Sequence, residues 1–463
     1  MLSKKIFKNK ISGFTLIETL IFLFIFSITG VTFYKGFAAG TKAMSNVRSR
    51  LGAIQLANEK IEVIHNLKYE DVGTVGGIPD GEIPNIETVV RSNKTYYVRT
   101  SVVLIDDPFD GTFAAGTDIR PADYKQVKVV AFWEDGNPEK SANMVTTISP
   151  PGVEAMYTGG ILSLNVVDSS GLGVSQANIR IVNNSVSPAV NAEYTTDLSG
   201  NLFLPEVPSS VQGYAIEVWK NGYFPAQTYA PFPISSFNPV DVHASVVVAS
   251  INQQTIVLDK ISNIKINVKS PLEENISEIN FSLEGGRQMG NTLDTPPVGV
   301  WLFPKISFVS NSEGKVSLTN ISPGPYYFEY SSGTKNDKYK FLYFDVANID
   351  SDPLSFNLVP ESTLEANLVL ADKETDSLVV TVLNDSDNKP IQDASIQMRN
   401  ESGSYDVTLT TNRFGKVYFP DSGTSLDAGD YKLNISCVGF TSLLEEDVTI
   451  NRLTLKEINL SAE

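Results

Sequence analysis

The stretch GFTLIETLIFLFIFSITGVTFY, residues 13–34, decides the fold of this chain. It follows a short basic segment, MLSKKIFKNKIS, which has no acidic residue and four lysines: Lys4, Lys5, Lys8 and Lys10. As a helix, the apolar run after the glycine spans about 30 Å, which is enough to cross the hydrocarbon core of a bilayer. The lysines favour a cytoplasmic front end, so the rest of the chain is predicted to be exported. No small-residue cleavage site of the ordinary secretory type follows the run.

One acidic residue, Glu18, interrupts the apolar run. Burying a charged side chain in a bilayer costs about 2.5–3.5 kcal/mol on insertion scales, so an unpaired carboxylate there needs a counter-charge. A cut between Gly13 and Phe14 would create a new α-amino group four residues before Glu18, on the same helix face. That amine can neutralise the carboxylate within one subunit or between neighbours. The alternative is an uncut signal anchor that tolerates an acid near its end.

The motif GFTLIE at residues 13–18, behind a lysine-rich leader, resembles the class III signal of type IV pilins and type II secretion pseudopilins. In that family an inner-membrane prepilin peptidase cuts after the glycine and methylates the new amino terminus, and the apolar helices pack into a fibre core. The resemblance implies that Gly13 and Phe14 form the processing site and that Glu18 acts in filament assembly. It also implies several partners: other pilin subunits, the prepilin peptidase, the inner-membrane pilus assembly machinery and membrane lipid.

The composition argues against several other classes of protein. The chain has 463 residues, which at about 150 residues per domain suggests about three domains. It carries 36 basic and 53 acidic residues, a net charge of −17 that becomes −21 without the leader lysines, so no nucleic-acid partner is expected. The single cysteine, Cys437, excludes an internal disulfide, and only His65 and His243 are available for histidine chemistry. We therefore expect no catalytic residue, no metal site and no cofactor.

After the cleaved leader, residues 1–13, we expect two elements. The first is a membrane and filament-core helix over residues 14–66, and the second is a small β head over residues 67–150. Apolar side chains at intervals of three, four and seven form one helix stripe, predicted to pack on the head: Met44, Val47, Leu51, Ile54, Ile61 and Ile64. Three glycines weaken the helix and predict local bending in a packed filament: Gly30, Gly36 and Gly40. Residues 67–94 are predicted to be rich in loops, followed by three strands at 95–105, 123–135 and 143–149. This head resembles those of minor pilins and the smaller pseudopilins.

Between the first two of these strands lies a cluster of four acidic residues: Asp106, Asp107, Asp110 and Asp118. Several carboxylates near a glycine raise the question of a calcium site. Counted from Asp106 as an EF-hand loop, however, the third position is Pro108 and the twelfth is Thr117, where the loop needs ligands. The pattern therefore favours a solvated loop over a calcium site.

Beyond Pro150 a β-rich pattern recurs about every hundred residues, which predicts three modules: 159–259, 260–360 and 372–463. Each copy has a turn glycine, then a strand of alternating polar and apolar residues, then a strand that begins with a tyrosine. The glycine and tyrosine are Gly200 and Tyr214 in the first copy, Gly314 and Tyr326 in the second, and Gly415 and Tyr431 in the third. Short strands at this density favour β-sandwiches. The copies resemble carboxypeptidase-regulatory-like, Ig-type sandwiches, the second less closely than the others. That resemblance implies a spacer or binding module without catalytic residues. The predicted closing strands are TIVLD, LSFNLVP and LKEINLS.

The expected fold class is an α+β pilin-like N-terminal domain, with a long helix and a small antiparallel sheet, followed by three all-β Ig-like sandwich modules. The expected function is that of a minor type IV pilin-like subunit, sparse or at the tip of a pilus, whose modules serve adhesion to a surface ligand or assembly. One alternative is a pseudopilin of a type II secretion-like system. Another is a membrane-anchored surface adhesin without a filament. The expected location is a prokaryotic inner membrane, then the pilus or cell surface.

Overall fold

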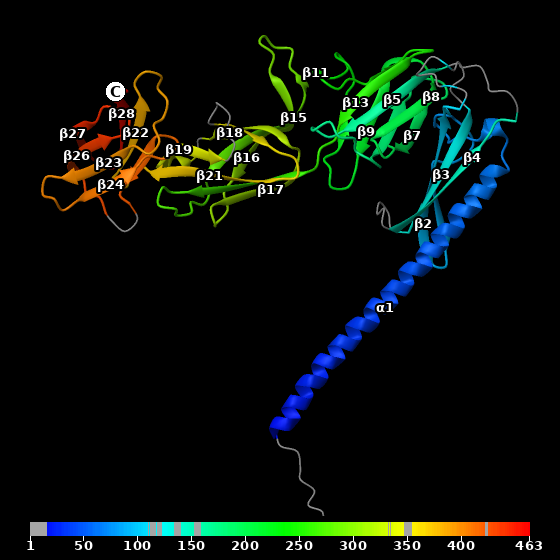
Figure 1. Ribbon diagram of the computed structural model, residues 1–463, viewed down its shortest axis with the longest axis horizontal. Coiled ribbons are helices and arrows are strands. Elements are labelled where there is room, and N and C mark those ends of the chain that lie inside the picture. Colours follow the sequence, from blue (N-terminus) through cyan, green and yellow to red (C-terminus); the bar gives the residue numbers. More distant parts are fainter. Residues whose placement is uncertain are drawn as a thin grey trace, which may run out of the picture.

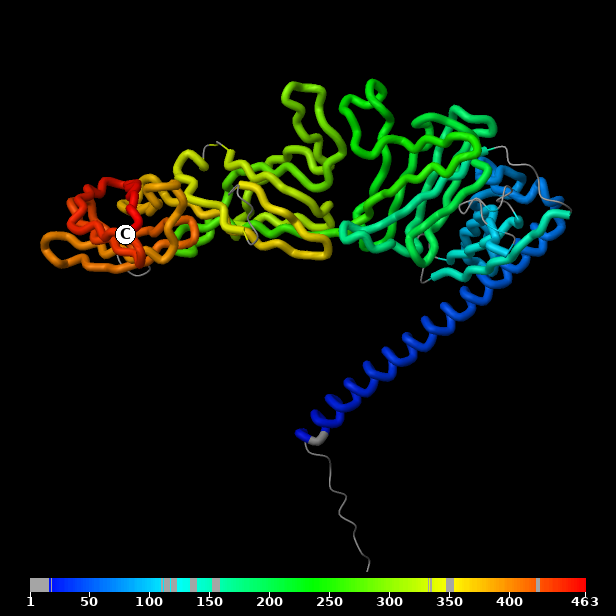
Figure 2. Tube along the Cα trace, turned by 45° about the horizontal axis from the view of Figure 1, so that its top comes forward, coloured from blue at the N-terminus to red at the C-terminus, as the bar shows by residue number. Residues whose placement is uncertain are grey.

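The computed structural model describes residues 16–109, 111, 117, 123–133, 140–151, 159–331, 333, 335–346, 354–421 and 425–463. One long N-terminal helix is followed by a series of β-sheets whose neighbouring strands are mostly antiparallel. Figures 1 and 2 show the helix leaving one end of a row of β units, with the C-terminus at the other end of the row. The predicted fold class, a helix followed by β-sheet and sandwich units, is confirmed.

The helix α1 (Leu16–His65) runs without interruption for 50 residues, or about 75 Å at 1.5 Å per residue. The hydroxyls of Ser27 and Thr29 each donate a hydrogen bond to the carbonyl oxygen four residues earlier at 2.7 Å, and Thr32 does so at 2.9 Å. These bonds supply acceptors for hydroxyl groups that would otherwise face lipid without a partner. Helical geometry continues through the three glycines, so bending there in a filament stays a prediction.

A short 3-10 helix η1 (Tyr69–Asp71) leads into the head, which is a four-stranded antiparallel sheet in chain order: β1 (Ile86–Arg91), β2 (Lys94–Ile105), β3 (Tyr124–Phe132) and β4 (Ser141–Ile148). Strand β1 corrects the prediction that its segment is loop. Ser92 and Asn93, with φ of 50° and 61°, form the two-residue turn between β1 and β2. Positive φ at both positions is typical of a hairpin turn that matches the twist of the strands.

The last part of α1 packs on one face of this sheet. The helix contributes small and medium side chains to the shared core: Ala53, Leu56, Ala57, Ile61 and Ile64. Gly52 lets the helix approach closely, because a Cβ there would lie 2.4 Å from the hydroxyl of Tyr96. The predicted stripe is therefore only partly right. Its first members point elsewhere and are 57–69 % exposed: Met44, Val47 and Leu51. A hydrophobicity pattern gives little weight to alanine and glycine, which determine this contact.

Polar ties hold the same part of α1 to the first hairpin of the head. Lys60 forms an ion pair with Glu87 of β1 at 2.6 Å. Arg91 at the end of β1 forms one with Glu59, also at 2.6 Å. Although exposed pairs of this kind contribute little to stability individually, both join α1 to the edge strand β1, beside the apolar contact, and so help to set the rotation of the helix.

The first sandwich packs a three-stranded sheet, ordered β13-β5-β8, on a five-stranded one, ordered β10-β9-β6-β7 with β12 also paired to β9. Its strands are β5 (Gly160–Val167), β6 (Asn178–Asn183), β7 (Val190–Thr195), β8 (Asn201–Val207), β9 (Ser210–Trp219), β10 (Ala226–Gln227), β12 (Ala244–Val246) and β13 (Ile251–Val257). Aliphatic side chains from both sheets fill one core, as alternation along each strand predicts.

The second sandwich has an aromatic core and two sheets, ordered β17-β14-β21-β19 and β11-β15-β18-β20 with β16 also paired to β15. Its strands are β14 (Ser262–Lys269), β15 (Asn280–Asn291), β16 (Gly299–Val309), β17 (Lys315–Ile321), β18 (Gly324–Tyr330), β19 (Tyr339–Val346), β20 (Ser355–Leu358) and β21 (Thr363–Asp372). A short 3-10 helix η3 (Asn336–Lys338) precedes β19, and β11 (Asn238–Pro239) comes from the preceding segment of chain. The predicted closing strand LSFNLVP is β20, in the opposite sheet, and β21 is the parallel partner of β14 instead.

The third sandwich has sheets ordered β25-β22-β28 and β24-β23-β26-β27. Its strands are β22 (Ser377–Asn384), β23 (Ser395–Asn400), β24 (Asp406–Thr410), β25 (Lys416–Phe419), β26 (Gly429–Ser436), β27 (Leu443–Ile450) and β28 (Leu453–Leu460). Cys437 is half-buried and packs against the core of this sandwich, as expected for a small apolar residue.

The three sandwiches repeat one framework around their first strands. In each, that strand pairs in parallel with the last strand and antiparallel with the strand after the turn glycine. The carbonyl oxygens of Gly200, Gly314 and Gly415 each accept a hydrogen bond from the first strand, at 2.7–2.8 Å. All three glycines have positive φ, and a Cβ would lie 2.4–2.7 Å from a first-strand carbonyl oxygen. The recurring glycine is therefore required by the turn itself.

A tyrosine corner is the second repeated device. The hydroxyl of Tyr214 donates to the carbonyl oxygen of Pro208 at 2.5 Å, that of Tyr326 to Ser322 at 2.8 Å, and that of Tyr431 to Asp427 at 2.9 Å. All three rings are buried. The aromatic residues that mark the repeat in the sequence therefore close the cores, and they are not part of an exposed binding surface.

We predict that Gly415→Ala destabilises the third sandwich by about 3–5 kcal/mol, because it adds a steric clash to an unfavourable positive φ. Gly439→Ala is the matched control. Gly439 also has positive φ, but its Cβ would meet nothing within 4 Å, so it should cost only about 1–2 kcal/mol. Thermal unfolding of both variants measures the difference. Equal losses of stability in the two variants would show that the close contact between Gly415 and the first strand contributes nothing.

Lys125 of β3 is buried on the α1 side of the head sheet. Its ammonium donates a hydrogen bond to the carbonyl oxygen of Tyr69 at 2.6 Å and lies 4.5 Å from the centre of the Tyr69 ring. Burial lowers the pKa of Lys125 from 10.5 to about 8, against the opposing attraction of Asp71 and Glu70. Between these two pKa values the unfolded chain keeps a proton that the folded chain has lost, so stability rises with pH across that window.

We predict that the free energy of unfolding of the head, relative to that of Lys125→Met, rises by about 1–3 kcal/mol between pH 7.5 and 10. Trp133 lies in the head core, so its fluorescence reports on this unit when Trp219 and Trp301 are replaced by Phe. Lys265→Met, at an exposed position, serves as the control. A pH-independent difference for Lys125→Met would contradict the prediction.

Candidate functional site

The N-terminal half of α1 presents a long uncovered apolar surface. Every large apolar side chain from Leu16 to Phe37 is 53–81 % exposed, on all sides of the helix. No charged residue lies between Thr19 and Tyr34. Among the described residues, α1 is the one helix long and apolar enough to cross a membrane. An apolar surface on all sides suits a helix surrounded by lipid or by other helices, and not one that lies on the surface of a soluble domain.

The predicted processing residues, Gly13 and Phe14, lie outside the described residues. Glu18 belongs to the first turn of α1, between exposed apolar neighbours, but its side chain lies outside what the structure describes. The structure therefore places Glu18 at the start of the apolar surface. The pairing of its carboxylate with an amine stays a prediction.

The uncovered surface continues along α1 towards the head. Met44, Val47, Leu51 and Ile54 lie on a face of the helix that the head does not cover. In Figure 1 the earlier part of α1 extends away from the β units, whereas this part runs beside β2 of the head, with these side chains on its uncovered face. The first four members of the stripe that the sequence predicted to contact the head thus form a second apolar face, available to a neighbouring molecule, while Ile61 and Ile64 pack on the head as predicted.

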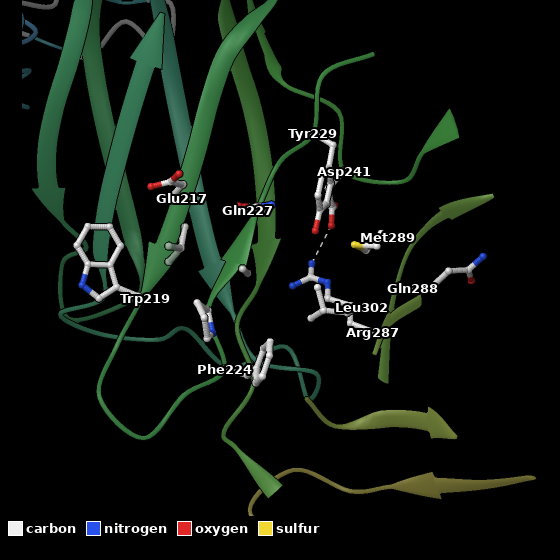
Figure 3. A pocket seen from close by; sticks show the side chains of 13 residues that line it. Glu217, Trp219, Phe224, Gln227, Tyr229, Asp241, Arg287, Gln288, Met289 and Leu302 are labelled. Atoms are coloured by element: carbon white, nitrogen blue, oxygen red, sulfur yellow. Dashed lines mark hydrogen bonds and ion pairs between the residues drawn. The ribbon is translucent and has the colours of Figure 1, made fainter. Parts of the chain in front are cut away.

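A second candidate surface is a pocket of about 380 Å³ at the junction of the first two sandwiches. Figure 3 shows Arg287 of β15 beneath Tyr229, with its guanidinium directed at the carboxylate of Asp241. The ion pair measures 2.9 Å, and the same guanidinium donates to the carbonyl oxygen of Val257. Phe224 forms part of the apolar wall. Because these bonds engage the guanidinium from two sides, Arg287 acts as a tie between sandwiches.

The same junction is fixed by a shared strand. β11 pairs with the end of β15, where Pro239 lies opposite Gly290. A Cβ on Gly290 would be 2.2 Å from the carbonyl oxygen of Asn238, so glycine is required for this approach. The next residue, Val240, donates its N–H to the carbonyl oxygen of Met289 at 2.9 Å. Backbone pairing across the junction makes the two sandwiches one continuous unit, and sequence patterns within each repeat do not signal it.

The acidic loop of the head contains two described carboxylates of the four that prompted the calcium question. Asp107 accepts the N–H of Phe109 at 3.1 Å, and its own N–H donates to Asp123. Asp110 and Asp118 lie outside the described residues. In the described part of the chain, no group of three or more His, Cys, Asp or Glu side chains could hold a metal ion.

The two histidines form separate polar contacts. His65 at the end of α1 lies 2.9 Å from the hydroxyl of Thr146 in β4, and His243 lies 2.9 Å from that of Thr228. Burial lowers the pKa of His243, which favours its neutral form at pH 7. Each histidine joins neighbouring elements, and the two belong to different units of the fold.

Comparison with protein families finds one match, to the prokaryotic N-terminal methylation motif, at residues 8–34. The match covers the end of the basic segment, the predicted processing site and the charge-free part of α1. It supports a class III prepilin-like N-terminus on a membrane-anchored, surface-exposed protein. A search of curated proteins gives no match.

Several solved structures show distant similarity. The Bacillus anthracis TIE protein has 11 % identity and a TM-score of 0.21, over 81 % of this chain and 72 % of that chain. A streptococcal ancillary pilin has 13 % identity and a TM-score of 0.19, over 66 % and 99 %. BcpA, the major pilin subunit of Bacillus cereus, has 9 % identity and a TM-score of 0.17, over 66 % and 100 %. At these scores we draw no functional conclusion from the likeness.

Proposed function

We propose that this chain is a minor type IV pilin-like structural subunit that a prepilin peptidase processes and that enters a pilus sparsely or at its tip. The observation that carries the proposal is an uncovered apolar helix joined directly to a methylation motif. The described contacts of the head with that helix lie in its last part, from Ser49 to His65, with the apolar contact at residues 53–64. The rest of α1 is therefore free to lie first in lipid and then among the helices of neighbouring subunits.

The proposed assembly step depends on Glu18. A cut between Gly13 and Phe14 would release the basic leader and create an amine at the front of α1. Within a subunit or across to its neighbour, this amine would neutralise the carboxylate in surroundings where an unpaired charge is costly. A subunit would then enter the fibre with both charges satisfied, which couples processing to assembly.

The sandwiches argue for a low copy number. They account for about two thirds of the chain, and Figure 2 shows them extending well to the side of the helix. A fibre wall made only of this subunit would need room for all of them at every helical step. We therefore propose a tip or sparse position, from which the sandwiches make contact with a surface ligand or with the assembly machinery.

The domain boundaries that we propose follow the hydrophobic cores of the head and of the three sandwiches. We propose 1–13 as the cleaved leader, 14–66 as the membrane and filament helix, 67–150 as the head, and 159–259 as the first sandwich. For the second sandwich we propose 260–372, because β21 belongs to its sheet. The third sandwich follows over 373–463. No catalytic role is proposed for any of these units.

We predict that Glu18→Val reduces the amount of this chain in sheared surface fibres at least about tenfold, because loss of one buried charge pair is worth more than 1.4 kcal/mol. Insertion into the membrane should continue, since the variant is more apolar. Immunoblots of the sheared-fibre and membrane fractions measure both. Glu62→Gln, on an exposed and distant turn of α1, is the matched control and should change neither amount.

Unchanged incorporation of Glu18→Val would contradict the proposed function. A deletion strain gives a second readout. Intact pili with lost export of soluble proteins would assign the chain to a secretion pseudopilus. Normal surface exposure without any fibre association would assign it to a membrane-anchored adhesin.

A further inference from the structure

A cleft of about 640 Å³, lined by both polar and aromatic side chains, lies between the head and the first sandwich. Residues alternate along β2 and β3, so one set faces α1 and the other faces away from it. The second set includes Tyr97, Arg99, Lys128 and Phe132, which form one wall of the cleft. The opposite wall comes from β7 and from the ends of β6 and β9 in the first sandwich. The cleft is therefore built from two units that are far apart in sequence.

The two walls are held in place by direct contacts. The hydroxyl of Tyr194 in β7 accepts the buried N–H of Ile78 at 2.7 Å, and Asn191 donates its N–H to the carbonyl oxygen of Gly76 at 2.7 Å. Val103 of the head packs against the core of the first sandwich. These contacts give the cleft a fixed width, as a ligand site requires.

The charge of the cleft is opposite to that of the chain. Among the described lining residues, three are cationic and one is a carboxylate, in a protein of net charge −17: Arg99, Lys128, Lys220 and Glu193. Arg99 and Glu193 pair with each other at 2.8 Å. Lys220 donates to the carbonyl oxygen of Ser175 at 2.7 Å and lies over the Tyr223 ring. Neither lysine has a carboxylate partner among the described lining residues, and Lys128, held by one hydroxyl, has the fewer contacts.

Lys128 is only partly satisfied. Its ammonium donates to the hydroxyl of Thr195 at 3.1 Å, and an ammonium has three N–H donors. Burial lowers the pKa of Lys128. Beside it, the buried Nε of Arg99 has no hydrogen-bond partner among the described residues. A bound monoanion would supply the acceptors that the Lys128 ammonium lacks.

The remaining lining favours a sugar over a bare ion. Rings of Tyr97, Phe132 and Trp219 line the same space as the amides of Gln176 and Asn178. Aromatic faces pack on the apolar faces of pyranose rings, and amides bind hydroxyl groups as both donors and acceptors. The volume exceeds what a single small ion needs. A carboxylated sugar combines one negative charge with a ring and several hydroxyls, and so matches every part of this lining.

We propose that the cleft between the head and the first sandwich binds an acidic saccharide, with Lys128 on the sugar carboxylate. The site does not depend on entry into a filament, because both walls belong to one chain. Binding to the purified protein therefore tests it separately from the proposed pilin function.

The experiment is calorimetric titration of the full chain, kept in solution with a detergent that has no sugar headgroup. The probes are trigalacturonate, the neutral maltotriose and inorganic phosphate. We expect trigalacturonate to bind at least about tenfold more tightly than either other probe, and more weakly as salt increases. Lys128→Met should weaken binding at least about tenfold, while Lys128→Arg, which keeps the charge, should stay within about threefold of the unmodified chain.

Lys389→Met is the matched control, because Lys389 is exposed in the third sandwich and its loss changes the net charge equally. It should leave binding unchanged. Equal binding of maltotriose would overturn the role of the carboxylate, and equal binding of phosphate would overturn the saccharide. No detectable binding of trigalacturonate at concentrations up to about 1 mM, which corresponds to about −4 kcal/mol, would overturn the site, as would full binding by Lys128→Met.

Discussion

An apolar helix surface that no part of the chain covers is the constraint on which the rest of the structure depends. Fourteen large apolar side chains between Leu16 and Phe37 are more than half exposed. At about 1.5–3 kcal/mol for full burial of one such side chain, and with roughly 60 % of each still exposed, covering them is worth on the order of 10–25 kcal/mol. Water cannot be the final surroundings of such a helix. The head packs on the opposite end and the sandwiches lie further away, so lipid and neighbouring helices are the covers that remain.

Contacts between successive units join α1, the head and the three sandwiches into one continuous body. Ion pairs beside the apolar contact set the rotation of α1 on the head, and Arg99 with Glu193 links the head to the first sandwich. Arg287 and β11 join the first two sandwiches. At the last junction Arg413 reaches the carbonyl oxygen of Val346 at 2.6 Å, while Phe414 stacks on Tyr343 at 4.7 Å. A row of units tied in this way holds its outer sandwich far from α1, which suits the proposed display on a fibre.

The sequence was most informative where one residue type satisfies a strict local demand. The uninterrupted apolar run predicted α1, and the turn glycines marked the three sandwiches because positive φ and backbone contact leave no room for a side chain. Prediction failed where the decision was tertiary. The face of α1 on the head is chosen by Gly52 and small alanines, β1 is a strand because β2 pairs with it, and β21 replaces β20 as the closing strand through long-range pairing. The cleft around Lys128 joins segments that no local pattern connects. The motif at Gly13, Phe14 and Glu18 differs from these cases. Its pattern is local and can be read from the sequence, but the amine proposed to pair with Glu18 would exist only after a peptidase has cut the chain.

The most direct test of the central claim is mass spectrometry of the amino terminus of this chain, isolated from sheared surface fibres of its native host. The account predicts a chain that begins with N-methylated Phe14, recovered with the fibres. A chain that still begins with Met1, or one that is found in the membrane fraction and never in the fibres, would contradict it.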